Sequence, residues 1–125
     1  MLNQDAADAL TLAYQWELIA ERSAGSASER VPGLDLSRMV TAAQRTRAAL
    51  ADLMQAARLP LPDDPGSNWQ DSLVELSRGH AAVQDLERAA QLEPALRPVA
   101  EAVHAASEVH RECALEALTR IRPMS

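Results

Sequence analysis

The side chains of this sequence that could do chemistry are few, and the first pair is Glu101 and His104. The two residues have the spacing Glu-x-x-His inside the longest helical pattern of the chain. Residues three apart on a helix are neighbours on its surface, and carboxylates and neutral imidazoles bind transition metals when they converge on one point. If this pair turned into a core, it would be a candidate metal site.

The orientation of the pair follows from winding its helix at about 100° per residue. The winding gives one apolar stripe, which consists of Leu96, Val99, Ala100, Val103, Ala106, Ala114, Ala117, Leu118 and Ile121. His104 lies on the flank of this stripe, and Glu101 lies on the opposite side beside Glu108 and Glu112. We therefore expect Glu101 to lie on a solvated acidic face, with His104 at its edge.

Other ionisable side chains do fall on inward stripes. His110 lies within the apolar stripe of its helix, and His80 and Glu87 share the inward stripe of the preceding helix. His80, Glu87 and His110 are the candidate ligands of a metal site, which would bind iron or another divalent transition metal. The alternative, which we expect, is that each histidine is satisfied inside the core by a backbone carbonyl, Ser107 or a carboxylate, with no cofactor.

A cation also falls on an inward stripe, because Arg47 lies between the apolar positions Ala43 and Leu50 on the expected second helix. A buried charge is costly unless it is paired and hydrogen-bonded. The nearest candidate acceptors are Glu87 and Glu17. We expect Arg47 and Glu87 to form a buried ion pair that fixes the register of the helices, and Arg47 and Glu17 to belong to a core polar network.

The composition predicts the elements that position these side chains. A chain of 125 residues is of the usual size for one domain with one core, so a single domain is expected over residues 1–125. Alanine and leucine are the commonest residues and favour helices. Turn, proline and capping residues delimit four helices, at about residues 4–23, 35–58, 68–90 and 95–121. Gly79 is a weak point inside the third helix.

The joints between the helices predict the topology. Short joints make neighbouring helices antiparallel, so we expect an all-α, antiparallel up-down-up-down four-helix bundle. The joint at residues 59–67 spans at most about 30 Å, which is less than the length of the helices on either side of it. A crossover that would make the second and third helices parallel is barely reachable on this estimate.

Two of the expected helices carry motifs of a known superfamily. The motifs are Gln44-x-x-Arg47-x-x-Leu50-x-x-Leu53-Met54 with Leu59-Pro60-Leu61-Pro62 after it, and Glu101-x-x-His104. They resemble ferritin-like proteins, in which Glu-x-x-His precedes a leucine pattern and a proline-bearing loop. The resemblance implies that Glu17 and either Glu75 or Glu87 stand where that family places single carboxylates. Gln44 and Arg47 replace the family's Glu and His, so the resemblance implies a degenerate metal site.

The charges exclude several classes of partner. The net charge is −6, the sequence contains no lysine, and the arginines are scattered, so we expect neither nucleic-acid binding nor membrane binding. The single Cys113 cannot form an intramolecular disulfide, which favours a reducing, cytoplasmic location. There is no nucleophile motif and no phosphate-binding glycine loop, so we do not expect an enzyme.

The first helix indicates a partner. Its apolar residues are distributed around nearly the whole circumference, which is typical of a helix buried on all sides. In a four-helix bundle each helix has an exposed face, so we expect Tyr14 and Leu18 to be covered by a second copy or another protein. The function expected is a non-enzymatic interaction module that acts as a homodimer, adaptor or small chaperone-like protein. The alternatives are a degenerate ferritin-like metal-binding or redox protein and, more remotely, a bundle that holds a small apolar ligand.

Overall fold

The computed structural model describes residues 2–121, and all of its regular structure in that range is helical. The elements are α1 (Gln4–Arg30), α2 (Ser37–Ala56), α3 (Trp69–Arg78), α4 (Ala81–Leu92), the 3-10 turn η1 (Pro94–Leu96) and α5 (Arg97–Ile121). The prediction of an all-α chain is confirmed. None of these helices has a stretch that is long and apolar enough to cross a membrane.

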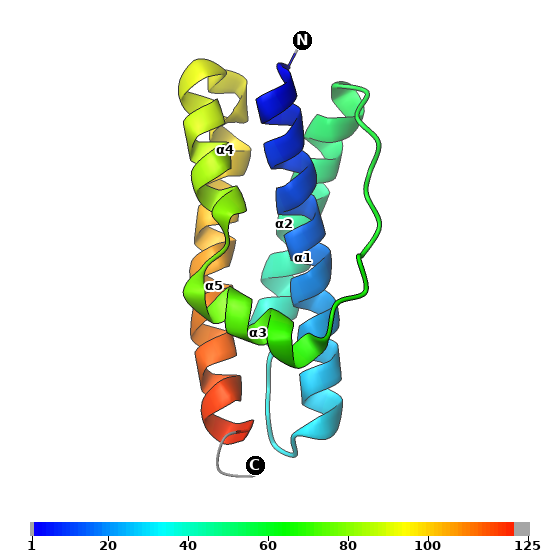
Figure 1. The fold of residues 1–125 in the computed structure, drawn as a ribbon, viewed down its shortest axis with the longest axis vertical. Coiled ribbons are helices and arrows are strands. Elements are labelled where there is room, and N and C mark those ends of the chain that lie inside the picture. Colours follow the sequence, from blue (N-terminus) through cyan, green and yellow to red (C-terminus); the bar gives the residue numbers. More distant parts are fainter. Residues whose placement is uncertain (1, 122–125) are drawn as a thin grey trace.

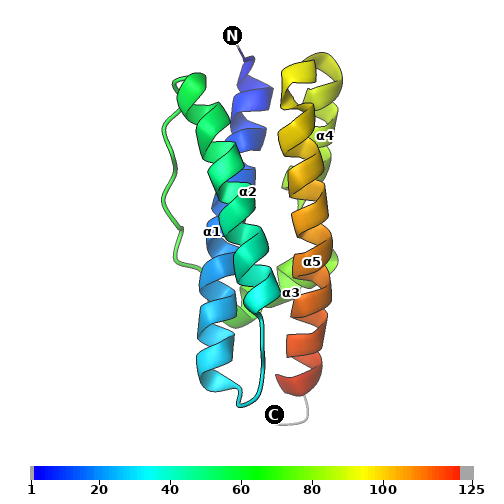
Figure 2. The same cartoon turned by 180° about the vertical axis from the view of Figure 1, so that it is seen from behind.

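The helices form an elongated bundle in which α3 and α4 together take the place of one long helix (Figure 1). Helix α1 packs against α2, α3 and α4, and α5 packs against the same three helices from the other side. Helices α1 and α5 therefore lie on one diagonal of the bundle, and α2 and α4 lie on the other (Figure 2).

The core consists of two apolar clusters stacked along the bundle. The upper cluster joins the start of α1 to the ends of α2 and α4 and the start of α5; it includes Ala6, Leu10, Leu50, Met54, Leu86, Ala90, Val99 and Val103. The lower cluster joins the end of α1 to the start of α2, to α3 and to the end of α5; it includes Ala20, Ala27, Leu36, Met39, Leu73, Leu76, Ala114 and Ala117. Helices α2 and α4 thus run in the same direction, and α1 and α5 run in the opposite one.

This path corrects the expected up-down-up-down topology. The connection at residues 57–68 is a return segment that descends beside α1, from Leu59 at the upper cluster to Trp69 at the lower one (Figure 1). Because α2 ends at Ala56 and α3 begins only at Trp69, this crossover has residues enough for about 40 Å of extended chain. The structure therefore contains the crossover between the second and third expected helices that the length estimate judged barely reachable.

Arg22 fixes the return segment against α1. Its Nε lies 2.6 Å from Oδ2 of Asp64, and its other guanidinium nitrogens donate to the backbone carbonyl and the hydroxyl of Ser67. Gln15 donates a further hydrogen bond to the carbonyl of Asp63. Bidentate arginine contacts of this kind combine charge with fixed geometry, so the segment lies on one defined face of α1.

Two element boundaries differ from the prediction for physical reasons. Helix α1 continues to Arg30 through the small residues expected to form a loop, because Ala24 and Ala27 are buried in the lower cluster. The expected helix 68–90 is broken at Gly79, whose φ of +83° is outside the range of a right-handed helix. His80 then stands at the N-cap position of α4.

Candidate functional site

A polar layer separates the two apolar clusters, and its centre is a pair of fully buried side chains. Glu17 of α1 and His110 of α5 each have 0% exposed surface, and His110 Nε2 lies 2.9 Å from Glu17 Oε1. Among the described residues, neither Glu17 Oε2 nor His110 Nδ1 has a hydrogen-bond partner. The layer therefore holds a carboxyl group and an imidazole that contact each other through one polar atom of each side chain, while the other polar atom of each has no partner among the described residues.

The electrostatics of Glu17 follow from this burial. Desolvation raises the pKa of Glu17, while the hydrogen bond from His110 and the charges of His110 and Arg47 act in the opposite direction without cancelling it. A carboxyl group in such a site releases its proton reluctantly. The pair can therefore hold a proton between acid and base, and its ionised form is costly.

His80 is the second ionisable group of the polar layer. Its ring stacks on Trp16 of α1, with ring centroids 5.0 Å apart and an interplanar angle of 11°. The residue is only 7% exposed, and within the described part of the chain neither ring nitrogen has a hydrogen-bond partner. Burial, with a smaller contribution from the charge of His110, lowers the pKa of His80 to about 4.

Arg47 lies beside this layer but not in the predicted pair. It is half-buried and donates to Glu21 Oε1 at 2.8 Å, rather than to Glu17 or Glu87. Burial alone would raise the pKa of Glu21, but the hydrogen bonds from Arg47 and Gln44 and the charge of Arg47 lower it. Arg47 still acts on Glu17 through its charge.

The three metal candidates His80, Glu87 and His110 do not converge. Glu87 was expected to point inward, but it is exposed and its Oε1 lies 2.9 Å from Nδ1 of the exposed His104. The reason is the break at Gly79, which resets the phase of α4 so that Ala82, Leu86 and Ala90 form its buried stripe. No group of three or more His, Cys, Asp or Glu within residues 2–121 is placed to hold a metal ion.

Glu101 and His104, which have the Glu-x-x-His spacing, lie on the surface. Glu101 is exposed on α5, as the winding predicts, and His104 is exposed one turn along and paired with Glu87 of α4. The Glu-x-x-His spacing therefore contributes to a surface ion pair between two helices. Pairs of this exposure contribute little to stability.

The predicted interface residues of helix 1 are half-buried. Tyr14 packs against the upper cluster, and Leu18 is of intermediate exposure. Gln15 and Arg22 lie about one turn before and after Leu18, and both bind the return segment 57–68. Part of the outer face of α1 is thus covered by the chain itself, a cover that the expected topology did not provide.

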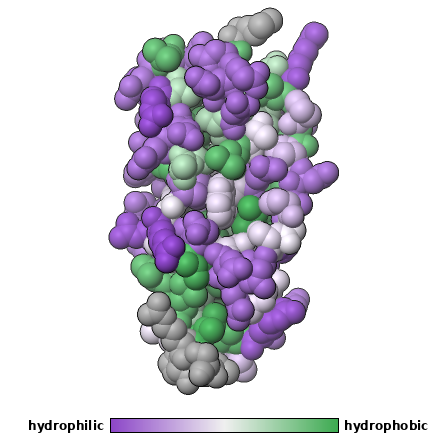
Figure 3. Space-filling model, viewed as in Figure 1, coloured by the Kyte–Doolittle hydropathy of each residue, from purple (hydrophilic) through white to green (hydrophobic). Residues whose placement is uncertain are grey.

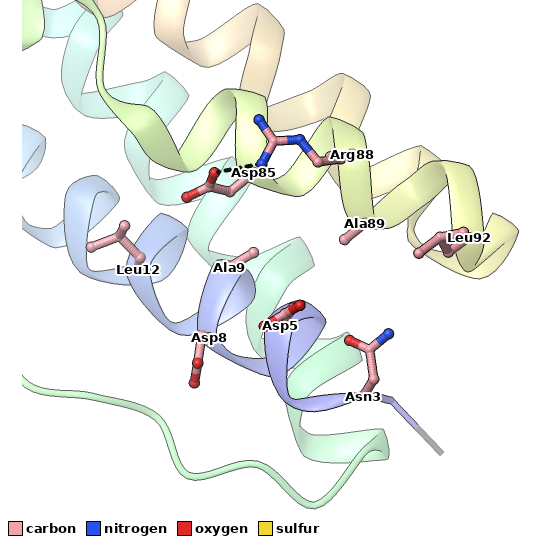
Figure 4. Close-up of a pocket in the computed structure, with 9 residues that line it drawn as sticks. All are labelled: Asn3, Asp5, Asp8, Ala9, Leu12, Asp85, Arg88, Ala89 and Leu92. Atoms are coloured by element: carbon pink, nitrogen blue, oxygen red, sulfur yellow. Dashed lines mark ion pairs between the residues drawn. The ribbon is translucent and has the colours of Figure 1, made fainter.

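A groove at the upper end of the bundle is the second candidate site (Figure 4). It has a volume of about 390 Å³ and lies between the start of α1 and the end of α4. Its apolar side chains are Ala9, Leu12, Ala89 and Leu92, and its polar ones are Asn3, Asp5, Asp8, Asp85 and Arg88. Leu92 is 76% exposed, the most exposed large apolar side chain among the described residues.

The charges of the groove are mostly negative. Arg88 is paired with Asp85 at 3.8 Å, and among residues 2–121 no ion pair involves Asp5 or Asp8 of α1. The sequence did not reveal the groove, because an up-down-up-down bundle would place the end of the third helix far from the start of the first. Figure 3 shows hydrophilic side chains over most of the visible face, with smaller apolar areas between them.

We compared the chain with known protein families, curated proteins and solved structures. No family model, no curated protein and no solved structure matches this chain.

Proposed function

We propose that this protein is a non-enzymatic interaction module that binds a segment of a partner protein in the groove between α1 and α4. The observation that carries the proposal is Leu92, an apolar side chain 76% exposed at one end of the groove, whose other apolar lining residues are Ala9, Leu12 and Ala89 (Figure 4). Exposed apolar side chains gathered in a concave surface with a polar rim are typical of binding sites. Helix α1 would then bind the partner through Asp5, Asp8, Ala9 and Leu12, a different face from that of Tyr14 and Leu18.

The charges favour a basic amphipathic helix as the occupant. Grooves between two helices bind a third helix through apolar anchors spaced at three and four residues. The wall from Asn3 to Leu12 extends over roughly 14 Å of helix, enough for two to three turns of a bound helix. Asp5 and Asp8 complement arginine or lysine on the partner.

A second copy of this chain fits the groove less well. Two copies docked through the same groove would bring the same aspartates together, and like charges across an interface cost binding energy. The net charge of −6 adds to this repulsion at long range. We therefore place an adaptor or small chaperone-like role, with a basic partner, ahead of a homodimer through Tyr14 and Leu18. We also propose a cytoplasmic setting, which the free Cys113 supports.

A designed peptide tests the docking surface. The probe is a fluorescent 15-residue amphipathic helix with leucine on one face and arginine on the other, and the readout is anisotropy. We expect saturable binding that weakens with added salt and falls at least fivefold in Leu92→Ala and in Asp5→Asn/Asp8→Asn. Leu115→Ala, at an exposed leucine of α5, is the matched control and should bind normally.

Two results would overturn this proposal. One is equal peptide affinity for the groove variants and the control. The other is a dimer in solution that Leu92→Asp converts to monomer, which would assign the groove to a second copy.

The alternative is a degenerate ferritin-like metal-binding or redox protein. The crossover at residues 57–68 supports it, since that family joins its second and third helices by a long crossover. The dispersal of His80, Glu87 and His110 counts against it. Stoichiometric iron or another transition metal in protein purified without chelator, lost in His80→Ala/His110→Ala, would favour this alternative over the interaction module.

A further inference from the structure

The break between α3 and α4 places an ionisable ring in the core directly after a glycine with a positive φ. Gly79 has a φ of +83°, and a Cβ added there would meet no atom within 4 Å, so the junction has open space around it. His80 follows it, and no side chain caps the first turn of α4. The stack on Trp16 joins this junction to α1.

The charged groups around His80 come from four helices. His110 of α5 acts on it through its charge and is bound to Glu17 of α1. The open surface beside the junction is lined by Arg78 of α3, Glu87 of α4, and His104 and Glu108 of α5. Of these carboxylates, Glu17 is engaged by His110 and Glu87 by His104. Within residues 2–121, His80 forms no ion pair.

We propose that His80 is a proton-operated latch: the neutral ring, stacked on Trp16, holds the α3–α4 junction against α1, and protonation releases the junction while the rest of the bundle stays folded. The imidazolium would have two N–H donors, and in the stacked position neither ring nitrogen forms a hydrogen bond with any described residue. The face of Trp16 offers a cation–π contact, but it does not satisfy these donors, and an unsatisfied buried charge is strongly disfavoured. Swinging about Gly79 brings the ring to water.

The two apolar clusters make such a movement local. Leu73 and Leu76 anchor α3 in the lower cluster, and Ala82, Leu86 and Ala90 anchor α4 in the upper one. His80 lies between Leu76 and Ala82, so the movement that we propose is confined to the short stretch between these two anchors. The latch would operate whether or not the groove between α1 and α4 binds a partner.

Fluorescence of Trp16 tests the latch directly. In a Trp69→Phe background, emission is followed from pH 7.5 to 3.5 together with far-UV circular dichroism and the NMR signals of the His80 ring. We expect a reversible emission step, coincident with protonation of His80, at a midpoint between the buried value of about 4 and the free value of 6.5. Less than a tenth of the helical signal should be lost across the step.

Matched variants separate the latch from other acid effects. His80→Phe keeps an aromatic ring on Trp16 but cannot be protonated, so the step should vanish; His104→Gln, at an exposed histidine, should keep it. The proposal is overturned by a step that persists in His80→Phe, by protonation of His80 without an emission step, or by simultaneous loss of helical signal. If His80→Phe does not fold, the coincidence of the ring titration and the emission step in the Trp69→Phe protein decides.

Discussion

His110 Nε2 lies 2.9 Å from Glu17 Oε1, and this contact joins the two diagonal helices α1 and α5 through the centre of the bundle. Most apolar contacts of α1 are with α2, α3 and α4, so this polar contact is a distinctive link across the diagonal. Its position between the upper and lower clusters fixes α1 and α5 in one relative register, because a shift of one turn would leave both groups buried and unpaired.

Replacing the buried carboxylate tests the cost of this link. Glu17→Gln keeps an oxygen for the His110 N–H and removes the buried charge, so we expect the free energy of unfolding at pH 7 to stay the same or rise by about 1 kcal/mol. Glu17→Ala leaves a cavity and an unpaired His110, and it should cost about 3 kcal/mol. Urea unfolding measures both, and equal losses in the two variants would contradict the account.

The pH dependence of this substitution has a definite sign. A raised pKa means that the folded protein holds the Glu17 proton more tightly than the unfolded chain does, so its contribution to stability is present below pH 4.5 and is lost as the pH rises. The advantage of Glu17→Gln over the wild type should therefore grow from pH 4.5 toward pH 7. A difference that shrinks with rising pH would be evidence against a raised pKa.

His80 has the opposite pH dependence. Its folded pKa of about 4 lies below the free value of 6.5, so the unfolded chain binds the extra proton and stability falls as the pH drops through this window. The shift corresponds to a loss of at most about 3 kcal/mol between pH 6.5 and pH 4, and release of the ring to water before pH 4 would make the loss smaller. His80→Phe should lack this loss and His104→Gln should retain it in urea unfolding series. An identical acid loss in His80→Phe would rule out His80 as its source.

Gly79 should resist substitution because of its backbone and not because of its neighbours. An added Cβ meets no atom, yet the φ of +83° is strained for any L-residue, so Gly79→Ala should cost about 1 to 3 kcal/mol. Gly25 in α1 also has open space but lies within a helix, so Gly25→Ala should stabilise by about 0.5 to 1 kcal/mol. Thermal unfolding of the two variants compares them, and shifts of the same sign would refute this explanation.

Removing the Arg22 contacts should free the return segment. Arg22→Ala breaks the hydrogen bonds to Asp64 and Ser67, so we expect faster proteolytic cleavage within residues 57–68 and a loss of about 1 to 2 kcal/mol. Arg38→Ala removes a well-exposed ion pair with Glu112 and should change stability by less than about 0.5 kcal/mol. Limited proteolysis with mass spectrometry locates the cleavage. Unchanged cleavage of Arg22→Ala would show that other contacts hold the segment.

The sequence predicted the parts of the fold that depend on local periodicity. The stripe of α5 was correct, with Val99, Val103, Ala106, Ala114 and Ala117 buried, and His110 was correctly placed among them. These residues lie on one unbroken helix, so counting at 100° per residue keeps its phase throughout.

Predictions that crossed a break or a loop failed. Counting through Gly79 carried the wrong phase into α4, which put Glu87 inside and missed Ala82 and Leu86. The path of residues 57–68 depends on long-range contacts with Arg22, which no local pattern indicates. The groove forms only because the chain follows that path, so the sequence pattern could not predict that Asp5 and Leu92 line the same groove.

The direction of α1 affects how the protein can be attached to a surface. The chain enters the bundle at Asn3, which lines the groove, whereas α5 ends at the opposite end of the molecule (Figure 1). A tag or tether joined to the chain directly ahead of Asn3 would therefore lie beside the groove, whereas one joined after Ile121 would leave the groove open to solution.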